Sequence, residues 1–175
     1  RRFSPDVFLD CSENYRKQTY RNRCRILTAN GPEDLRFPII HDGEKKIAEI
    51  RVDYSTPWVQ KTKTAIDSAY YSSPFFEYYR DELFAILDSR PETLWELDCS
   101  IINFFCARIG LPFPQTGSPD GGAEYDFRET IHPKKKPVEV NRAYWQVFRD
   151  KFGFVPNLSI MDLLFNEGPE SISYL

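Results

Sequence analysis

The segment from Pro91 to Ile109 constrains the fold most, because its apolar residues recur on almost every side of a helix. These residues are Leu94, Trp95, Leu97, Ile101, Ile102, Phe104, Phe105 and Ile109. A helix that is apolar almost all round is expected at the centre of a domain. Gly110 followed by Pro112 predicts its end, since both residues disfavour continuation of a helix. Other elements must therefore pack around this segment.

Three more helices are predicted. Pro57 follows Ser55-Thr56, a start signal, and apolar residues then recur at helical spacing up to Tyr70. A second segment with this spacing runs from Pro74 to Arg90. Near the end of the chain, Ser159 with Asp162 three residues later predicts a capping box, and Gly168-Pro169 predicts the end of that helix. A short helix is also predicted within residues 138–148, which contain Tyr144, Trp145, Val147 and Phe148.

The first third of the chain is rich in predicted strands. They are residues 6–11, 23–27, 34–40 and 47–52, with a turn predicted at Asn30-Gly31-Pro32. We therefore expect a mixed α/β fold over residues 1–175, as a single domain. A small mixed sheet from the N-terminal third packs against the helices of residues 57–110 and a C-terminal helix. Residues 112–122 are rich in Pro, Gly, Ser and Gln, which predicts a loop that is either mobile or lies over a site.

Composition excludes several classes of protein. No apolar run approaches the roughly 20 residues of a membrane-spanning helix, so no membrane span is expected. The four cysteines form no C-x-x-C pair, and two histidines complete no convincing zinc site, so no metal is expected. This cysteine usage is typical of buried thiols in a reducing compartment, which favours the cytoplasm. The sequence contains no dinucleotide-binding motif, no P-loop and no motif of a catalytic serine. Whether the protein uses a cofactor is therefore unknown from the sequence.

Positive charge is concentrated between Glu13 and Glu33. This stretch has no acidic residue and contains Arg16, Lys17, Arg21, Arg23 and Arg25, and removing these five charges from the net charge of −3 leaves −8 for the rest. A nucleic-acid-binding domain normally carries a net positive charge, so no nucleic acid is expected as a partner. The island is either a solvated basic face or a pocket for an anion such as a phosphate or a nucleotide diphosphate.

Arg21, Arg23 and Arg25 alternate, so on a strand all three would face one side. Three guanidinium groups cannot share a core, and that side must meet solvent or an anionic ligand. The sequence therefore predicts ligand binding by Arg21, Asn22 and Arg23. The competing interpretation is a structural salt bridge from Arg23 to Asp10, Glu13 or an acid of the helices.

Several longer strings resemble the WbqC-like family of bacterial proteins. They are residues 13–24 (ENYRKQTYRNRC), 50–58 (IRVDYSTPW), 70–79 (YYSSPFFEYY), 126–128 (DFR), 131–134 (IHPK) and 154–169 (FVPNLSIMDLLFNEGP). Members of the family are often encoded beside surface-polysaccharide or O-antigen genes, and this variant resembles those of the Bacteroides group. Compared with the family pattern, a first strand that would pair with residues 6–10 is expected to be missing, and Lys61-Thr62-Lys63 stands where members commonly carry a histidine.

The resemblance implies an enzyme of surface-polysaccharide biosynthesis that transfers an acyl or aminoacyl-type group to an activated amino sugar. The alternative is a non-catalytic scaffold that binds an anion or sugar nucleotide in the same pathway. Either way, the expected partner is a small anionic metabolite or nucleotide sugar.

Four further residues complete the candidate site. His132 lies within a matching string and is a candidate general base, although a lone histidine is often structural. Asp10 and Glu13 follow the first predicted strand, where α/β sheets bind ligands, and are candidate catalytic carboxylates. Asp10 is equally well explained as a cap at the end of that strand. Arg128, in the string Asp126-Phe127-Arg128, is a candidate ligand-binding residue.

Overall fold

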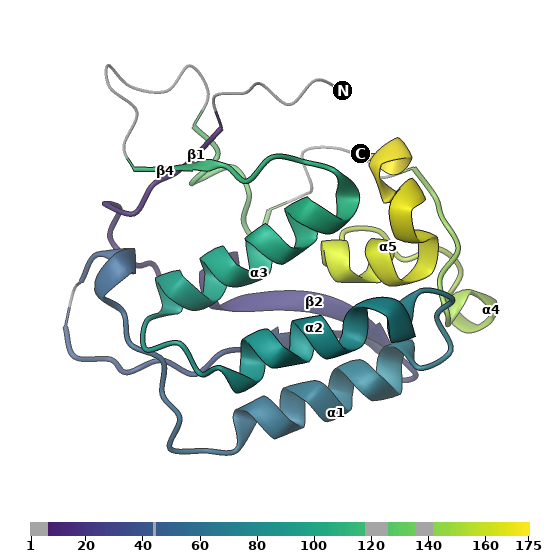
Figure 1. Ribbon diagram of the computed structural model, residues 1–175, viewed down its shortest axis with the longest axis horizontal. Coiled ribbons are helices and arrows are strands. Elements are labelled where there is room, and N and C mark those ends of the chain that lie inside the picture. The colour runs from purple at the N-terminus through teal and green to yellow at the C-terminus, as the bar shows by residue number, and fades with distance from the viewer. Residues whose placement is uncertain (1–6, 44, 118–125, 136–141) are drawn as a thin grey trace.

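The computed structural model describes residues 7–43, 45–117, 126–135 and 142–175 (Figure 1). Its α-helices are α1 (Trp58–Tyr70), α2 (Phe76–Asp88), α3 (Leu94–Ile109), α4 (Arg149–Phe152) and α5 (Ile160–Glu167). Its strands are β1 (Phe8–Leu9), β2 (Arg23–Thr28), β3 (Gly31–Arg36) and β4 (Gln115–Thr116). Three 3-10 helices are η1 (Tyr20–Asn22), η2 (Ile47–Glu49) and η3 (Gly168–Tyr174). The mixed α/β class is confirmed.

Helix α3 packs against α2, α5, η2 and η3, as expected of a central helix. It begins at Leu94 rather than Pro91, because Thr93 caps it. The Thr93 hydroxyl accepts from the Glu96 backbone N–H at 3.2 Å, and the Glu96 carboxylate accepts from the Thr93 N–H at 3.1 Å. The helix is less enclosed than its sequence predicts: Leu94 and Leu97 are fully buried, whereas Ile101 and Ile102 are only half-buried.

The strands form two separate two-stranded ladders rather than one sheet. Strands β2 and β3 are antiparallel, with Cys24 opposite Leu35 and Thr28 opposite Gly31. The turn is Ala29-Asn30, so β3 begins three residues before the predicted strand. Strand β1 pairs in parallel with β4, which comes from the predicted loop of residues 112–122. Residues 118–122 of that loop lie outside the described part of the chain.

Two local predictions are wrong, each because a side chain bonds to the backbone. Residues 47–52 alternate like a strand, yet η2 forms at residues 47–49, where the Glu49 carboxylate accepts from the Lys46 N–H at 3.2 Å, whereas Arg51 and Val52 each form an isolated β-bridge. Within residues 138–148, residues 142–148 contain no helix, and 138–141 lie outside the described residues. The Gln146 amide donates to the Val155 carbonyl and accepts from the Val155 N–H, both at 2.9 Å, which holds this segment extended.

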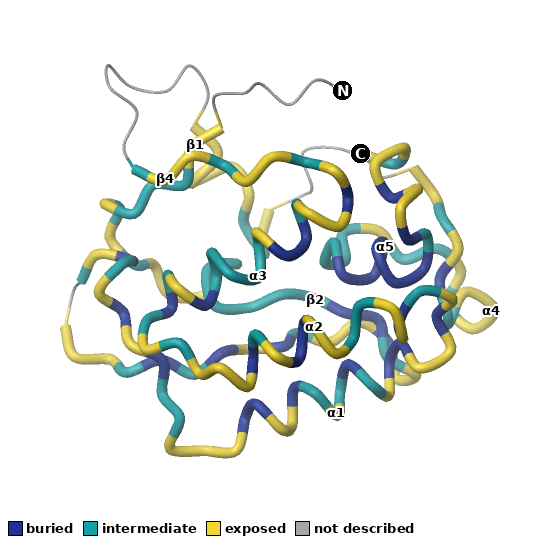
Figure 2. The backbone as a smooth tube through the Cα atoms, viewed as in Figure 1, coloured by how far each residue is buried: buried dark blue, intermediate teal, exposed yellow. Residues whose placement is uncertain are grey.

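A buried polar cluster connects residues 144–146 to helix α5. The Asp162 carboxylate accepts from the Tyr144 hydroxyl at 2.7 Å and from the Gln146 amide at 3.1 Å. Asp162 therefore does not complete the predicted capping box; Ser159 alone caps α5 by accepting from the Met161 N–H at 3.3 Å. Burial raises the pKa of Asp162. Figure 2 shows the result as a continuous buried stretch along α5, from Met161 to Asn166.

Within the described chain, no helix has both the length and the apolar character needed to cross a membrane. Nor do the described residues include a group of three or more His, Cys, Asp or Glu placed to hold a metal ion.

Two glycines that end helices allow a matched test of packing after α5. Gly168 has φ +57°, and a Cβ there would lie 2.6 Å from the Phe75 ring, whereas Gly110 has φ +76° and open space around it. We expect Gly110→Ala to lower the free energy of unfolding by about 1 kcal/mol, from backbone strain alone. Gly168→Ala should lower it by about 2–4 kcal/mol, since overpacking adds to strain. Urea denaturation of both variants checks this, and equal losses would contradict the close approach of Phe75.

Candidate functional site

A cleft of about 1370 Å³ opens along α3. Its walls come from β1, β2, α1, α2, α3, the start of α5 and residues 126–131. On its rim, Asp126 and Arg128 are charged and 47% and 49% exposed, whereas the charged Arg23 of the lining is only 12% exposed. Side chains deeper in the cleft are apolar and buried, for example Ile66 and Leu83, each 1% exposed. The cleft therefore combines a polar rim with an apolar interior.

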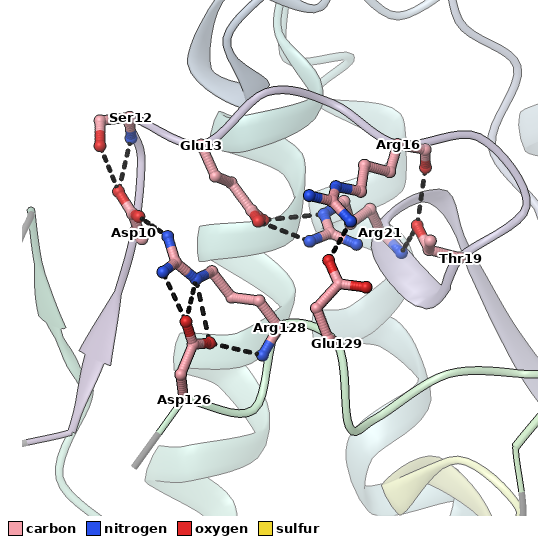
Figure 3. A network of polar contacts seen from close by, with 9 residues as sticks. All are labelled: Asp10, Ser12, Glu13, Arg16, Thr19, Arg21, Asp126, Arg128 and Glu129. Atoms are coloured by element: carbon pink, nitrogen blue, oxygen red, sulfur yellow. Dashed lines mark hydrogen bonds and ion pairs between the residues drawn. The ribbon is translucent and has the colours of Figure 1, made fainter. Parts of the chain in front are cut away.

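Arg128 joins two distant segments of the rim (Figure 3). Its Nη1 donates to Asp10 Oδ2 at 2.6 Å, and its Nη2 donates to Asp126 Oδ2 at 2.5 Å. Hydrogen bonds from Arg128 lower the pKa of Asp126 to about 2, so that carboxylate is charged at neutral pH. The same pairing raises the pKa of Arg128. Beside it, Arg16 forms an exposed ion pair with Glu129.

Arg21 and Glu13 form a second, less exposed pair on the rim (Figure 3). The guanidinium donates from Nε at 2.7 Å and from Nη2 at 2.5 Å to the two carboxylate oxygens. Such two-point contacts fix orientation as well as charge. Arg21 lies in η1, whose first turn is capped by the Thr19 hydroxyl, and not on a strand as the alternation predicts. Glu13 and Arg21 thus form a fixed polar wall of the cleft.

Arg23 and Arg25 both lie on β2, and both contact Asp34 of β3. Arg25 Nε donates to Asp34 at 3.0 Å, and Arg23 Nη1 lies 3.5 Å from it. Arg23 Nε donates to the Thr19 carbonyl at 2.8 Å. The salt bridge considered for Arg23 therefore exists, but its partner is Asp34, which the hairpin register places opposite Arg25. Arg23 still lines the cleft, so ligand binding by this residue stays a prediction.

The structure gathers five of the seven candidate residues at the cleft: Asp10, Glu13, Arg21, Arg23 and Arg128. Asn22 and His132 are not among the described residues that line it. The Asn22 amide donates to the Phe37 carbonyl at 2.9 Å, which ties η1 to the residue after β3. His132 Nδ1 accepts from the Lys134 N–H at 3.1 Å in a local turn. A structural role explains both contacts, and the catalytic role of His132 stays untested.

Asp98 is the cleft residue that sequence reasoning missed. It lies on α3, half-buried in the cleft wall, and among the described residues no hydrogen bond or ion pair meets its carboxylate. Burial raises the pKa of Asp98 well above its usual value. The signal was present in the sequence: α3 carries only two acids, and the helix cap explains Glu96. A carboxylate left without a partner inside an apolar helix points to a functional group.

Two thiols near Asp98 are protonated at neutral pH. Burial raises the pKa of Cys24 to about 12 and that of Cys99 to about 11, and the charge of Asp98 adds to both shifts. Thiolates, not thiols, are the nucleophiles of cysteine chemistry. The titratable group of this wall that is suited to proton transfer is therefore Asp98, whose pKa is raised by burial.

The unpaired carboxylate predicts an unusual stability profile. The pKa of Asp98 is raised in the folded protein, whereas in the unfolded chain it is about 3.9. The contribution of Asp98 to stability is therefore fully present below about pH 3.9. It is lost as the pH rises through the folded pKa and the buried carboxyl group becomes charged. Asp98→Asn should therefore match the native protein near pH 4 and exceed its unfolding free energy by at least about 1 kcal/mol at pH 8. Urea midpoints across this pH range check it.

Asp150→Asn serves as the control, because Asp150 is exposed on α4. It should leave the pH profile unchanged. If Asp98→Asn were less stable than the native protein at pH 8, the carboxylate must be held as an anion by a partner.

Known proteins resemble this chain along most of its length. The model of the WbqC-like protein family matches residues 5–132. "Uncharacterized protein Rv1507c" of Mycobacterium tuberculosis (strain ATCC 25618 / H37Rv) is 26% identical over 193 residues, which cover 92% of this chain and 83% of that protein. No solved structure matches. Because the family match spans well over half of the chain, this protein belongs to the WbqC-like protein family.

Proposed function

We propose that this protein is a cytoplasmic enzyme of bacterial surface-polysaccharide biosynthesis. It transfers an acyl or aminoacyl-type group to the amino group of an activated amino sugar. The observation that carries the proposal is the half-buried carboxylate of Asp98 in the wall of a large cleft, which has no partner among residues that the structure describes. The pathway is inferred from the resemblance to the WbqC-like family, which is an analogy at the level of the family.

The size of the cleft favours a reaction between two substrates. Pockets for one drug-sized ligand usually enclose about 300–1,000 Å³. At about 1370 Å³, this cleft has room for a donor and an acceptor at the same time. Binding both in one cleft makes their reaction effectively unimolecular, which is a major source of catalysis in group transfer.

Asp98 is suited to remove a proton from the acceptor amine. An amino sugar arrives largely as an ammonium ion, and only the neutral amine is a nucleophile. The carboxylate takes one proton, and the amine attacks the carbonyl carbon of the acyl donor. A C–N bond forms and the bond from that carbon to the leaving group breaks. The nitrogen then gives its second proton to the leaving group, and Asp98 releases the first proton to solvent. A raised pKa brings Asp98 nearer to the working pH, where general bases are most effective.

The rim offers suitable contacts for a sugar. Carboxylates such as Asp10 and Glu13 accept hydrogen bonds from hydroxyl groups, and guanidiniums such as Arg128 attract phosphate. Phe8 and Phe127 also line the cleft and are 36% and 52% exposed. Exposed aromatic faces are available to stack on a sugar ring. We therefore place the nucleotide sugar at the rim.

The alternative is a non-catalytic scaffold that binds an anion or sugar nucleotide in the same cleft. The guanidiniums of Arg21, Arg23 and Arg128 each contact a carboxylate, so each has reduced capacity for a phosphate. This bears equally on the enzyme and on the scaffold. The two functions differ in whether Asp98 affects turnover or only binding.

Activity measurements separate the two functions. Mixtures of acyl-CoA donors and nucleotide-linked amino sugars should yield an N-acylated product, detected by mass spectrometry. Asp98→Asn should lower kcat by about 10²–10⁴-fold with little change in KM, since a general base acts in the transition state. Asp150→Asn should keep native kcat. Ligand-induced thermal shifts without turnover in any mixture would instead establish a binding protein.

Arg128 should affect substrate affinity. Arg128→Gln removes a charge from the rim and should raise KM for a nucleotide sugar by about 10-fold or more, the usual size of one charge-assisted hydrogen bond. Stability should change little, because the Arg128 side chain is half exposed and solvent weakens its ion pairs. Arg149→Gln, an exposed arginine on α4, is the control. An unchanged KM for Arg128→Gln would remove this residue from the binding site.

A further inference from the structure

We infer that the apolar interior of the cleft holds an aliphatic acyl chain, so that the donor is a fatty acyl group rather than an acetyl or a polar aminoacyl group. This inference rests on the proposed function, since it names the donor of that reaction. It starts from α3, whose sequence is apolar almost all round. One apolar side packs into the core through Leu94 and Leu97, whereas Ile101 and Ile102 are half-buried and line the cleft.

The opposite walls of the interior are aliphatic as well. Helices α1 and α2 contribute Thr62, Ile66, Leu83 and Leu87 to the lining. Thr62 supplies the one hydroxyl among these four side chains. Buried apolar walls with so few polar groups bind apolar ligand surface by removing it from water. They leave the hydrogen-bonding groups of a polar ligand without partners.

The parts of the two substrates differ in how many polar partners they need from the lining of the cleft. A nucleobase presents donors and acceptors around its edge, and a sugar presents hydroxyls; both need polar partners, which the rim supplies. An aliphatic chain needs none. Each methylene moved from water into such an interior is expected to improve affinity about three- to fourfold. The polarity of the cleft therefore places the sugar at the rim and the chain inside.

The spacing along α3 connects the chain to the reacting group. Asp98 and Ile102 are four residues apart, so they lie on the same face of the helix with a rise of about 6 Å between them. Trp95 and Phe105 continue the same stripe, and all four residues line the cleft. A chain lying along this stripe brings its carbonyl carbon close to the Asp98 carboxylate. The donor is thus positioned where the proposed base acts.

Binding of saturated fatty acids of 2 to 16 carbons, measured by calorimetry below their micellar concentrations, tests the inference. Affinity should rise about three- to fourfold per methylene until the interior is filled, and then level off. Ile102→Trp should move that limit to a shorter chain, because the larger side chain occupies the same space. Asn103→Trp is the matched control: it adds the same indole on the next, exposed residue of α3 and should leave the limit unchanged.

Ile102→Ala enlarges the same space, so the chain length at which affinity levels off should become longer. It keeps the test decisive if the tryptophan variant fails to fold, which circular dichroism would reveal. Affinity independent of chain length, or equal effects of Ile102→Trp and Asn103→Trp, would overturn the inference.

The outcomes also separate this inference from the proposed function. A chain-length limit that depends on residue 102, without acyl transfer to any amino sugar, would support the acyl site and reject the transferase. Transfer of acetyl groups that requires Asp98, with no preference for longer donors, would support the transferase and overturn the acyl site.

Discussion

The burial of α3 is the constraint on which the rest of the structure depends. A helix with apolar residues on nearly every side must be covered, and α2, α5, η2 and η3 pack against it. The cover is incomplete, because Ile101, Ile102 and Asp98 face a cleft. The Asp98 carboxylate there lacks full hydration and, among the described residues, a partner for a hydrogen bond or ion pair, which is unfavourable for folding. Such local loss of stability is common at sites that function requires.

Ion pairs between distant segments shape the rim above this helix. Arg128 bonds to Asp10, 118 residues away, and thereby joins the segment after β1 to residues 126–128. The parallel pairing of β1 with β4 brings the same parts of the chain together. Exposed ion pairs contribute little to the free energy of unfolding, so their role here is to fix the positions of charged side chains on the rim. The rim is therefore ordered by contacts that are weak individually and specific in direction.

Local signals predicted the helices well, because periodicity and capping residues act over a few positions. Gly110 and Pro112 correctly predicted the end of α3, whereas its start was predicted at Pro91 and lies at Leu94, after the Thr93 cap. The failures at residues 47–52 and 142–148 arise from side chains that bond to the backbone, such as Gln146 to Val155. The pairing of β1 with β4 joins residues more than 100 positions apart, which no local pattern encodes.

For the site as well, local sequence signals were predictive, whereas contacts between distant residues were not. The end of the first predicted strand, charge patterning and family strings identified Asp10, Glu13, Arg21 and Arg128, which the fold does bring to one cleft. These signals could not tell which arginines contact acids. Asp98 was missed because the residues around it were interpreted only as an apolar helix, although the helix cap does not explain this acid. Its surroundings also bear on the order of chemical steps. Cys24 and Cys99, with pKa values near 12 and 11, are poor candidates for a covalent acyl intermediate. In the proposed reaction, direct attack of the amine on the donor requires both substrates together, which agrees with a cleft of this size.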